Sequence, residues 1–215
     1  MGKKSIVFML LVALGIAGWW FYPRFRPNIK NADPEGQTII ALGDSLTAGY
    51  GVQPEDSYVR RLEREFNVSI LNAGVVGDTT QDALARLEIS VLSRKPRVVI
   101  VFLGGNDLLQ QTYAEKTLDK IIENLDTIVQ AIQSKGAAVV LVGVSDSAGR
   151  GSLPSRIRAL AAKRGAGCVP NALKGVLDDH NLMLPDQIHP NGEGHKIMAE
   201  RIAKELRRSL PNVFR

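Results

Sequence analysis

Short apolar runs alternate with amphipathic stretches along most of the chain. The runs are rich in β-branched residues and apolar throughout, which is typical of strands buried on both faces of a parallel sheet. The pattern predicts strands at 38–42, 68–73, 97–103, 137–144 and 168–170. It predicts helices at about 57–66, 79–93, 116–135, 153–164 and 192–209. Strands that alternate with helices indicate an α/β protein, a three-layer α/β/α sandwich around a parallel sheet of about five strands.

The N-terminal part of the chain does not follow this pattern. Residues 5–23 carry no charge, and as a helix they would span about 28 Å, close to the ~30 Å hydrocarbon core of a membrane. Aromatic residues at 19–22 would then lie where an aromatic belt is found. We therefore expect an N-terminal hydrophobic helix in residues 1–23, a transmembrane anchor or a signal peptide. Residues 24–36 are predicted to be a linker, and 37–215 one domain.

The N-terminal segment is compatible with more than one location. A retained anchor would place the aromatic residues at the membrane interface, and we favour this interpretation, with the domain on the periplasmic side. Lys3 and Lys4, a short apolar region and the small residues of GIA (15–17) also fit a signal peptide, whose cleavage would leave a secreted or periplasmic protein. Basic residues flank the segment on both sides and do not decide its orientation, so a domain facing the cytoplasm is the further alternative.

The composition of the chain argues against some classes of function. The 215 residues include 27 basic and 22 acidic side chains, and the net charge of +5 is spread along the chain. The sequence has no basic run with interleaved aromatic residues and no zinc-ligand spacing, which argues against nucleic-acid binding. The single cysteine, Cys168, excludes an intrachain disulfide, and its surroundings indicate a buried structural thiol.

Unusual polar clusters lie at the ends of the predicted strands. GDSLTAGYG (43–51) follows the first strand, NAGVVGDTT (72–80) ends the second, GGND (104–107) follows the third, and PDQIHPNG (185–192) precedes the last helix. In an open parallel sheet, ligands bind beyond the carboxyl ends of the strands. We therefore expect these clusters to meet in one site.

Two of these clusters contain residues suited to nucleophilic catalysis. Ser45 is either part of a turn and helix cap or a nucleophile at a strand end. Asp186 precedes His189 by three residues, a spacing that lets the carboxylate accept the Nδ1 proton and leaves Nε2 as a base. Taken alone, the pair also fits an acid and a histidine near a helix N-terminus. Neither His180 nor His195 has an acid at comparable spacing on a strand-end loop, and we interpret both as surface residues.

The other two clusters contain groups that stabilise negative charge. Gly77 offers a backbone N–H in a loop, and Asn106 offers a side-chain amide, as an oxyanion hole requires. For each, a turn glycine or a helix cap is the alternative. Asp78 and Thr79 are expected to cap the following helix, and Asp107 is a further candidate cap.

In their order and separation, the four clusters resemble the conserved blocks of the GDSL or SGNH hydrolase family, and they are most similar to its bacterial arylesterase, thioesterase and lysophospholipase I branch. The resemblance runs from about residue 37 to the last helix and implies an SGNH hydrolase domain with a flavodoxin-like fold. Thr47 lies where the G-x-S-x-G elbow of α/β-hydrolases needs glycine, which disfavours that other fold.

The resemblance also implies residue roles. Ser45 would be the nucleophile, His189 the base and Asp186 the residue that orients the base. The oxyanion hole would consist of the N–H groups of Ser45 and Gly77 and the amide of Asn106. No metal ion or cofactor is required for this chemistry.

The implied activity is that of a serine esterase that hydrolyses acyl esters or thioesters, of the arylesterase, lysophospholipase or acyl thioesterase type. We expect a monomer whose partners are a small-molecule or lipid ester and, through the N-terminal helix, a membrane. Leucines near the site favour longer acyl chains, and the expected substrate contacts are Leu46, Gly105, Leu108 and Leu109. The alternatives are an O-acetylesterase acting on sugars or cell-wall glycans and an inactive, membrane-tethered binding protein.

Overall fold

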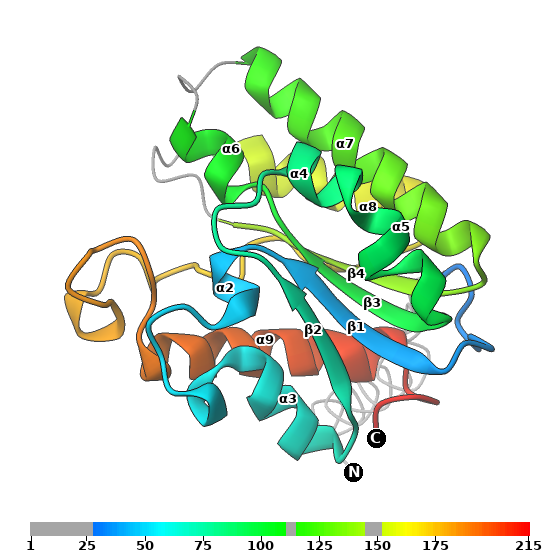
Figure 1. The fold of residues 1–215 in the computed structure, drawn as a ribbon, viewed down its shortest axis with the longest axis horizontal. Coiled ribbons are helices and arrows are strands. Elements are labelled where there is room, and N and C mark those ends of the chain that lie inside the picture. Colours follow the sequence, from blue (N-terminus) through cyan, green and yellow to red (C-terminus); the bar gives the residue numbers. More distant parts are fainter. Residues whose placement is uncertain (1–27, 111–114, 145–151) are drawn as a thin grey trace, which may run out of the picture.

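A computed structural model describes residues 28–110, 115–144 and 152–215 of the chain. Five parallel strands form one sheet in the order β2-β1-β3-β4-β5 (Figure 1). Their bounds are β1 Thr38–Gly43, β2 Ile70–Gly74, β3 Pro96–Phe102, β4 Ala138–Val142 and β5 Gly167–Val169. Each predicted strand is confirmed, with ends that differ from the prediction by no more than two residues.

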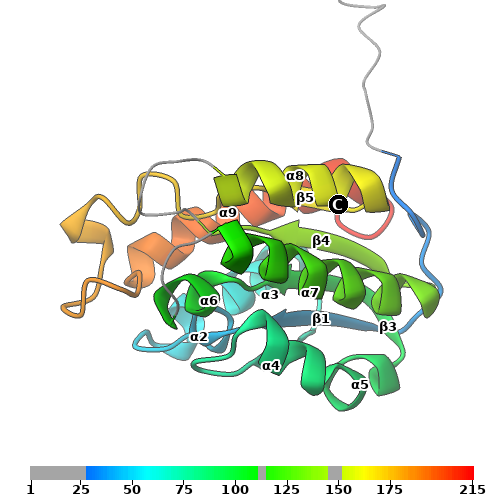
Figure 2. The ribbon, with the colours of Figure 1, turned by 90° about the horizontal axis from the view of Figure 1, so that it is seen from above.

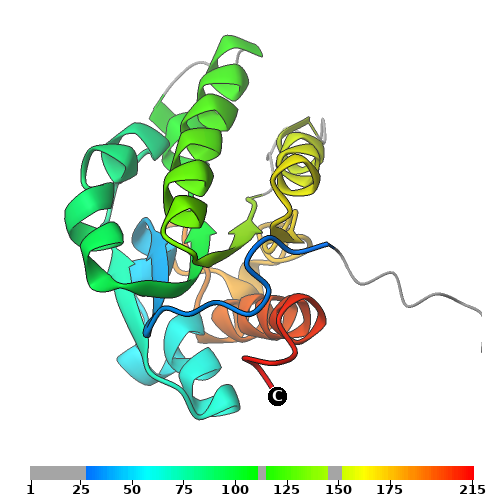
Figure 3. The same cartoon turned by 90° about the vertical axis from the view of Figure 1, so that its right-hand side faces the viewer.

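Helices cover both faces of the sheet, which confirms the three-layer α/β/α architecture (Figure 3). One face carries α3 (Tyr58–Phe66) and α9 (Gly192–Ser209). The other carries α4 (Thr80–Ala85), α5 (Leu87–Ser90), α7 (Glu115–Ser134) and α8 (Ser152–Arg164). Two short helices, α2 (Ser45–Ala48) and α6 (Gly105–Gln110), follow β1 and β3, and 3₁₀ turns occupy Pro54–Asp56, Leu92–Arg94 and His180–Leu182.

The predicted N-terminal hydrophobic helix lies outside the described residues. Within the ranges that the structure describes, no helix combines the length and hydrophobicity needed to cross a membrane. From Ile29 onward, the segment predicted to be a linker is attached to the domain: Ile29 is buried, the Lys30 N–H donates to the Gly165 carbonyl, and the Asn31 amide donates to carbonyls of Gln133 and Ala137. This attachment lies at the opposite end of the sheet from α2 and α6 (Figure 2).

The prediction of one helix over 79–93 was wrong. The segment is divided into α4, α5 and the turn Leu92–Arg94, with Arg86 between the two α-helices at φ −100° and ψ 5°. The Arg86 side chain is bound to groups at the ends of β1 and β2, contacts that the apolar pattern of this segment cannot reveal.

The core lies between the sheet and the two helical layers. Every residue of β4, and of β3 apart from Arg97, is buried. The inner face of α7 repeats at helical spacing and is also buried, with Leu118, Ile121, Leu125, Ile128, Val129 and Ile132. Burial of each such side chain contributes roughly 1.5–3 kcal/mol, far more than differences in helix propensity, so packing fixes the position of α7.

The interpretation of His195 as a surface residue was wrong, whereas His180 is exposed as expected. His195 is only 1% exposed, and its Nδ1 accepts a hydrogen bond from the Tyr58 backbone N–H at 3.2 Å. Its ring stacks on the Tyr58 ring, with centroids 6.3 Å apart. Burial, followed by the nearby charge of Arg61, lowers the pKa of His195 to about 4. His195 therefore links α9 to the start of α3 as a neutral ring.

This shift predicts a pH-dependent contribution to stability. An unfolded histidine binds a proton below about pH 6.5, whereas native His195 binds one only below about pH 4. Between these values the unfolded chain holds more protons, so acidification destabilises the fold. His195→Asn keeps an acceptor near the Tyr58 N–H and does not titrate. Its stability relative to wild type should therefore rise by about 2 kcal/mol between pH 7 and pH 5.

The measurement is urea unfolding of both proteins at the two pH values. Comparison with wild type is necessary because burial raises the pKa of Asp44 to about 6, which has the opposite effect on stability in this range and cancels between the two proteins. A difference in unfolding free energy that is the same at both pH values would contradict the assignment.

Candidate active site

Ser45 lies at the point where β1 turns into α2. The turn is tight, because a Cβ on Gly43 would lie 2.0 Å from the Thr47 hydroxyl oxygen, so only glycine fits. Asp44 is the N-cap of α2, and its carboxylate accepts the Leu46 N–H at 3.0 Å. Ser45 is the first residue of this helix, so its own N–H has no partner within the helix. The local fold thus holds both the hydroxyl and the N–H of Ser45 at the strand end.

Asp186 and His189 share a compact loop before α9. The Leu184 N–H donates to the His189 carbonyl at 2.8 Å, and Met183 pairs with Pro190 across the loop. One carboxylate oxygen of Asp186 accepts the backbone N–H groups of Ile188 and His189, both at 3.0 Å. The other lies 2.7 Å from His189 Nδ1.

The structure brings Ser45, His189 and Asp186 together. His189 Nε2 lies 3.0 Å from the Ser45 hydroxyl oxygen, while Nδ1 faces Asp186. The backbone N–H groups of His189 and Ile188, and then the His189 ring, lower the pKa of Asp186 to about 2. Asp186 is therefore ionised over the whole neutral range and can fix the His189 tautomer in which Nε2 faces the serine.

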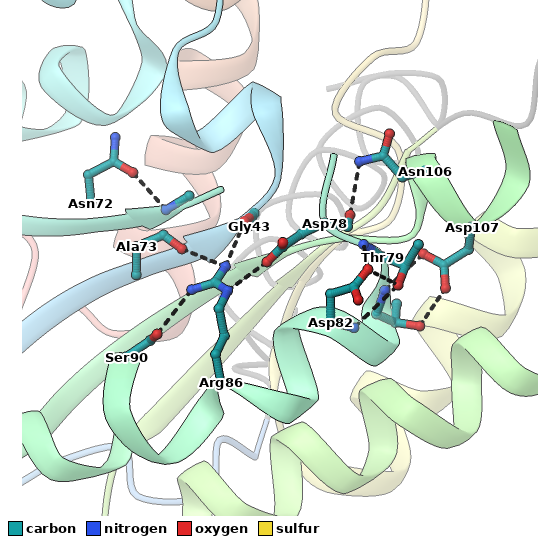
Figure 4. Close-up of polar contacts among 12 residues, drawn as sticks. Gly43, Asn72, Ala73, Asp78, Thr79, Asp82, Arg86, Ser90, Asn106 and Asp107 are labelled. Carbon is teal, nitrogen blue, oxygen red and sulfur yellow. Dashed lines mark hydrogen bonds and ion pairs between the residues drawn. The ribbon is translucent and has the colours of Figure 1, made fainter. Parts of the chain in front are cut away.

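Gly77 and Asn106 lie at the ends of the strands on either side of β1. Gly77 belongs to the loop after β2 and has φ +87°, a conformation that favours glycine. A Cβ on Gly77 would meet no atom within 4 Å, so this backbone faces open space. Asn106 is in α6, after β3, and its amide nitrogen donates to the Asp78 carbonyl at 2.9 Å (Figure 4). Its second N–H is left over for another acceptor.

The predicted caps behave in different ways. Thr79 is the N-cap of α4, in a capping box with Asp82. Asp78 is instead paired with Arg86 at 2.6 Å. Asp107 does not cap its own helix: its carboxylate accepts the N–H and hydroxyl of Thr80, at 2.9 and 2.6 Å, and so caps α4 from α6. These contacts fasten the Gly77 loop to the helix that carries Asn106.

Sequence reasoning missed Tyr50, whose ring lies against the His189 ring with centroids 4.7 Å apart. It is one of seven large apolar side chains that are exposed in the described part of the chain. Five of the seven lie in segments that carry the residues described above: Tyr50, Val75, Val76, Leu109 and Ile188. The signal in the sequence was that large apolar residues stand among the polar residues of these blocks, as Tyr50 does in GDSLTAGYG. In the structure they form exposed apolar surface, which marks binding sites.

The four residues expected to contact substrate are placed differently. Leu46 is buried in the core, Leu108 is partly buried against it, and Leu109 is 65% exposed. Gly105 begins α6 with intermediate exposure. Of the three leucines, Leu109 is thus the accessible one.

The described residues offer little support for metal binding or for a reactive cysteine. Among the described residues, no three His, Cys, Asp or Glu side chains are grouped so that they could hold a metal ion. Cys168 lies in β5, partly buried, and burial raises its pKa to about 11. The thiol is therefore protonated at neutral pH and unreactive, consistent with a structural role.

Comparison with known proteins places the chain in a family. The model of the GDSL-like lipase/acylhydrolase family matches residues 41–197. The chain is 30% identical to "Arylesterase" of Vibrio mimicus, over 85% of this chain and 94% of the relative. It is also 30% identical to "Thioesterase 1/protease 1/lysophospholipase L1" of Escherichia coli K12, over 79% and 83%.

Solved structures show the same fold. A crystal structure of TesA superposes with a TM-score of 0.74 at 28% sequence identity, covering 81% of this chain and all of that one. Three findings lead to the same assignment: the sheet, the extent of the sequence match, and the convergence of Ser45, His189 and Asp186 at the carboxyl edge. The chain belongs to the GDSL-like lipase/acylhydrolase family, which makes it an ester hydrolase.

Proposed function

We propose that this protein hydrolyses acyl esters and thioesters of medium or long chain length through a Ser45-His189-Asp186 triad. The observation that carries the proposal is the continuous hydrogen-bonded series from the Ser45 hydroxyl to His189 Nε2, at 3.0 Å, and from His189 Nδ1 to Asp186, at 2.7 Å. A nucleophile, a base within reach and a group that orients the base are what activation of serine requires.

The reaction follows from these positions. Ser45 Oγ attacks the acyl carbonyl carbon while His189 Nε2 takes the hydroxyl proton, and the carbonyl oxygen becomes an oxyanion. The N–H groups of Ser45 and Gly77 and the free N–H of the Asn106 amide stabilise this charge. His189 then protonates the leaving alcohol or thiol, and an acyl-enzyme remains. Water, deprotonated by His189, attacks the acyl-enzyme and releases the acid and Ser45.

The apolar surroundings favour an extended acyl group over acetyl. Val76 adjoins Gly77, Ile188 adjoins His189, and Leu109 follows Asn106 by one turn of α6; all three are more than half exposed. A chain of several methylene groups that covers such surface gains ~0.8 kcal/mol for each CH₂ that becomes buried. Acetyl groups gain little from these residues, so the geometry supports the arylesterase, lysophospholipase and thioesterase substrates over sugar acetates.

The test combines one variant with a substrate series. Ser45→Ala should lower kcat by about 10³-fold or more, because the triad acts as a unit, without loss of folding. Wild-type kcat/KM should rise from acetyl to octanoyl esters of p-nitrophenol and of coenzyme A. Near-normal turnover by Ser45→Ala would contradict the mechanism. A wild-type preference for acetyl would favour an O-acetylesterase, and no turnover of any ester would favour an inactive binding protein.

The role of Asn106 gives a second prediction. Asn106→Ala should lower kcat by about 10²- to 10³-fold, or ~2.7–4 kcal/mol, and change KM little, because the oxyanion exists only after attack. Gln110→Ala is the matched control: it removes an amide of the same helix, one that lies 3.4 Å from the Gly77 carbonyl, and should change kcat only a few-fold. A rise in KM at constant kcat would make Asn106 a substrate-binding residue instead.

We also propose that residues 5–22 hold the enzyme on a membrane, with the domain of residues 37–215 on the periplasmic side. The uncharged, membrane-length segment and its aromatic end support this proposal. Full-length protein in cell membranes should resist extraction with alkaline carbonate and be cleaved by protease added to spheroplasts. Soluble protein that begins at Gly18 would show a cleaved signal peptide, and protection until lysis would show a domain facing the cytoplasm.

A further inference from the structure

Arg86 is bound to three groups at the carboxyl edge of the sheet and to one in helix α5 (Figure 4). Its Nη2 donates to the carbonyls of Gly43, at 3.1 Å, and Ala73, at 2.9 Å. Its Nε donates to the Asp78 carboxylate at 2.6 Å, and its Nη1 to the Ser90 hydroxyl at 3.2 Å. The side chain is 21% exposed, and that of Asp78 is 10% exposed. One guanidinium thus links the end of β1, the end of β2 and the loop that follows β2.

The linked segments carry two of the proposed oxyanion donors, Ser45 and Gly77, and one of them is bound to the third, Asn106. Gly43 precedes Ser45 by two residues, and Asp78 directly follows Gly77. The carbonyl of the same Asp78 accepts one N–H of the Asn106 amide at 2.9 Å. Arg86 contacts none of the three donors directly. It is connected to Ser45 through Gly43, to Gly77 through Asp78, and to Asn106 through the hydrogen bond of the Asp78 carbonyl.

These contacts are of a kind that fixes position. The guanidinium is a planar fork whose donors have fixed directions, so binding several acceptors sets the acceptors' relative places. Bonds from a charged donor are stronger than neutral ones. A smaller side chain at position 86 would leave the Ala73 carbonyl and the Asp78 carboxylate short of donors, and the Gly77 loop would be free to shift.

We propose that Arg86 is a positioning residue of the oxyanion hole, which holds the Ser45, Gly77 and Asn106 donors in the arrangement that receives the carbonyl oxygen. The inference rests on the proposed esterase function. Donors stabilise the oxyanion only at hydrogen-bond distance from its final position, and a displacement of about 1 Å can cost on the order of 10²-fold in rate. Loss of Arg86 should therefore slow the chemical step more than it weakens substrate binding.

A purely structural role is the competing explanation, and the chain offers a matched control. Arg164 pairs with Asp126 in another part of the fold; the two side chains are 23% and 20% exposed, similar to the Arg86–Asp78 pair. Arg164 contacts none of the segments that carry the oxyanion donors in the described part of the chain. Arg164→Met therefore removes an arginine of similar exposure from an ion pair without disturbing the site, although Lys163 still pairs with Asp126 at 3.1 Å.

The experiment compares wild type, Arg86→Met, Arg86→Lys and Arg164→Met with p-nitrophenyl octanoate. Arg86→Met should lower kcat by about 10- to 100-fold with KM changed less than about threefold. Arg86→Lys, which keeps the charge but not the fork, should fall between it and wild type. Arg164→Met should lose stability yet keep kcat. The proposal would be overturned if kcat fell equally in both Met variants, or if Arg86→Met raised KM and left kcat unchanged.

An alkyl trifluoromethyl ketone supplies a readout that does not depend on how much of the protein is folded and active. Its adduct with Ser45 places an oxyanion in the hole. The inhibition constant of Arg86→Met should therefore rise by the same factor by which its kcat/KM falls. The measurement uses protein shown by circular dichroism to be folded. Unchanged inhibition alongside reduced kcat would overturn the positioning role.

A double variant separates this inference from the proposed function. If Arg86 acts through the hole, Arg86→Met should cost clearly less in the Asn106→Ala background than in wild type, since part of the hole is already lost. Costs that multiply fully would place Arg86 outside the hole and leave the esterase function intact. Absence of wild-type turnover would instead refute the esterase function itself.

Discussion

The site depends on the shared carboxyl edge of a parallel sheet. With β1 between β2 and β3, Gly43 pairs in register with Gly74 on one side and Phe102 on the other. The segments after these three strands must therefore leave the sheet side by side, and they carry Ser45, the Gly77 loop and Asn106. Only the loop with Asp186 and His189 comes from elsewhere, held over the same edge by the packing of α9 against α3.

Buried carboxylates at this edge hold its loops in place through hydrogen bonds and an ion pair. Buried carboxylates are costly unless they accept hydrogen bonds, and each acid here has donors. Asp44 caps α2, Asp107 caps α4 from a neighbouring helix, and Asp78 is paired with Arg86. Negative groups at helix N-termini are also favoured by the helix dipole. Acids that would otherwise destabilise the protein are thus satisfied at this edge, and Asp78 and Asp107 connect segments that are far apart in the sequence.

Sequence patterns predict those parts of the structure in which apolar residues recur at a regular period or functional residues lie close together in the sequence. The strands follow from apolar runs, and α7 from its helical repeat. The convergence of Ser45, Asp186 and His189 was implied by the resemblance of the four ordered blocks to a hydrolase family, since the spacing of Asp186 and His189 alone also fitted a helix N-terminus. The structure brings the three residues together. The family follows from the order of four blocks and is confirmed.

Long-range polar contacts could not be predicted in this way. Arg86 lies where the expected helix is divided and binds groups on two strands, and Asp107 caps a helix other than its own. His195 was misread for a different reason. The surface interpretation considered only the lack of an acid at suitable spacing. The helical period of α9 was the neglected signal, because His195 occupies the same buried face as Met198 and Ile202, three and seven residues later.

The identity of the nucleophile is the central claim, and covalent labelling tests it most directly. Wild-type protein and Ser45→Ala would be treated with an alkyl fluorophosphonate and analysed as intact proteins and as peptides by mass spectrometry. A serine activated by His189 should give a single phosphonyl adduct, located on Ser45 and absent from the variant. An adduct on another residue, an equal adduct in Ser45→Ala, or no adduct on folded wild-type protein would contradict the serine mechanism.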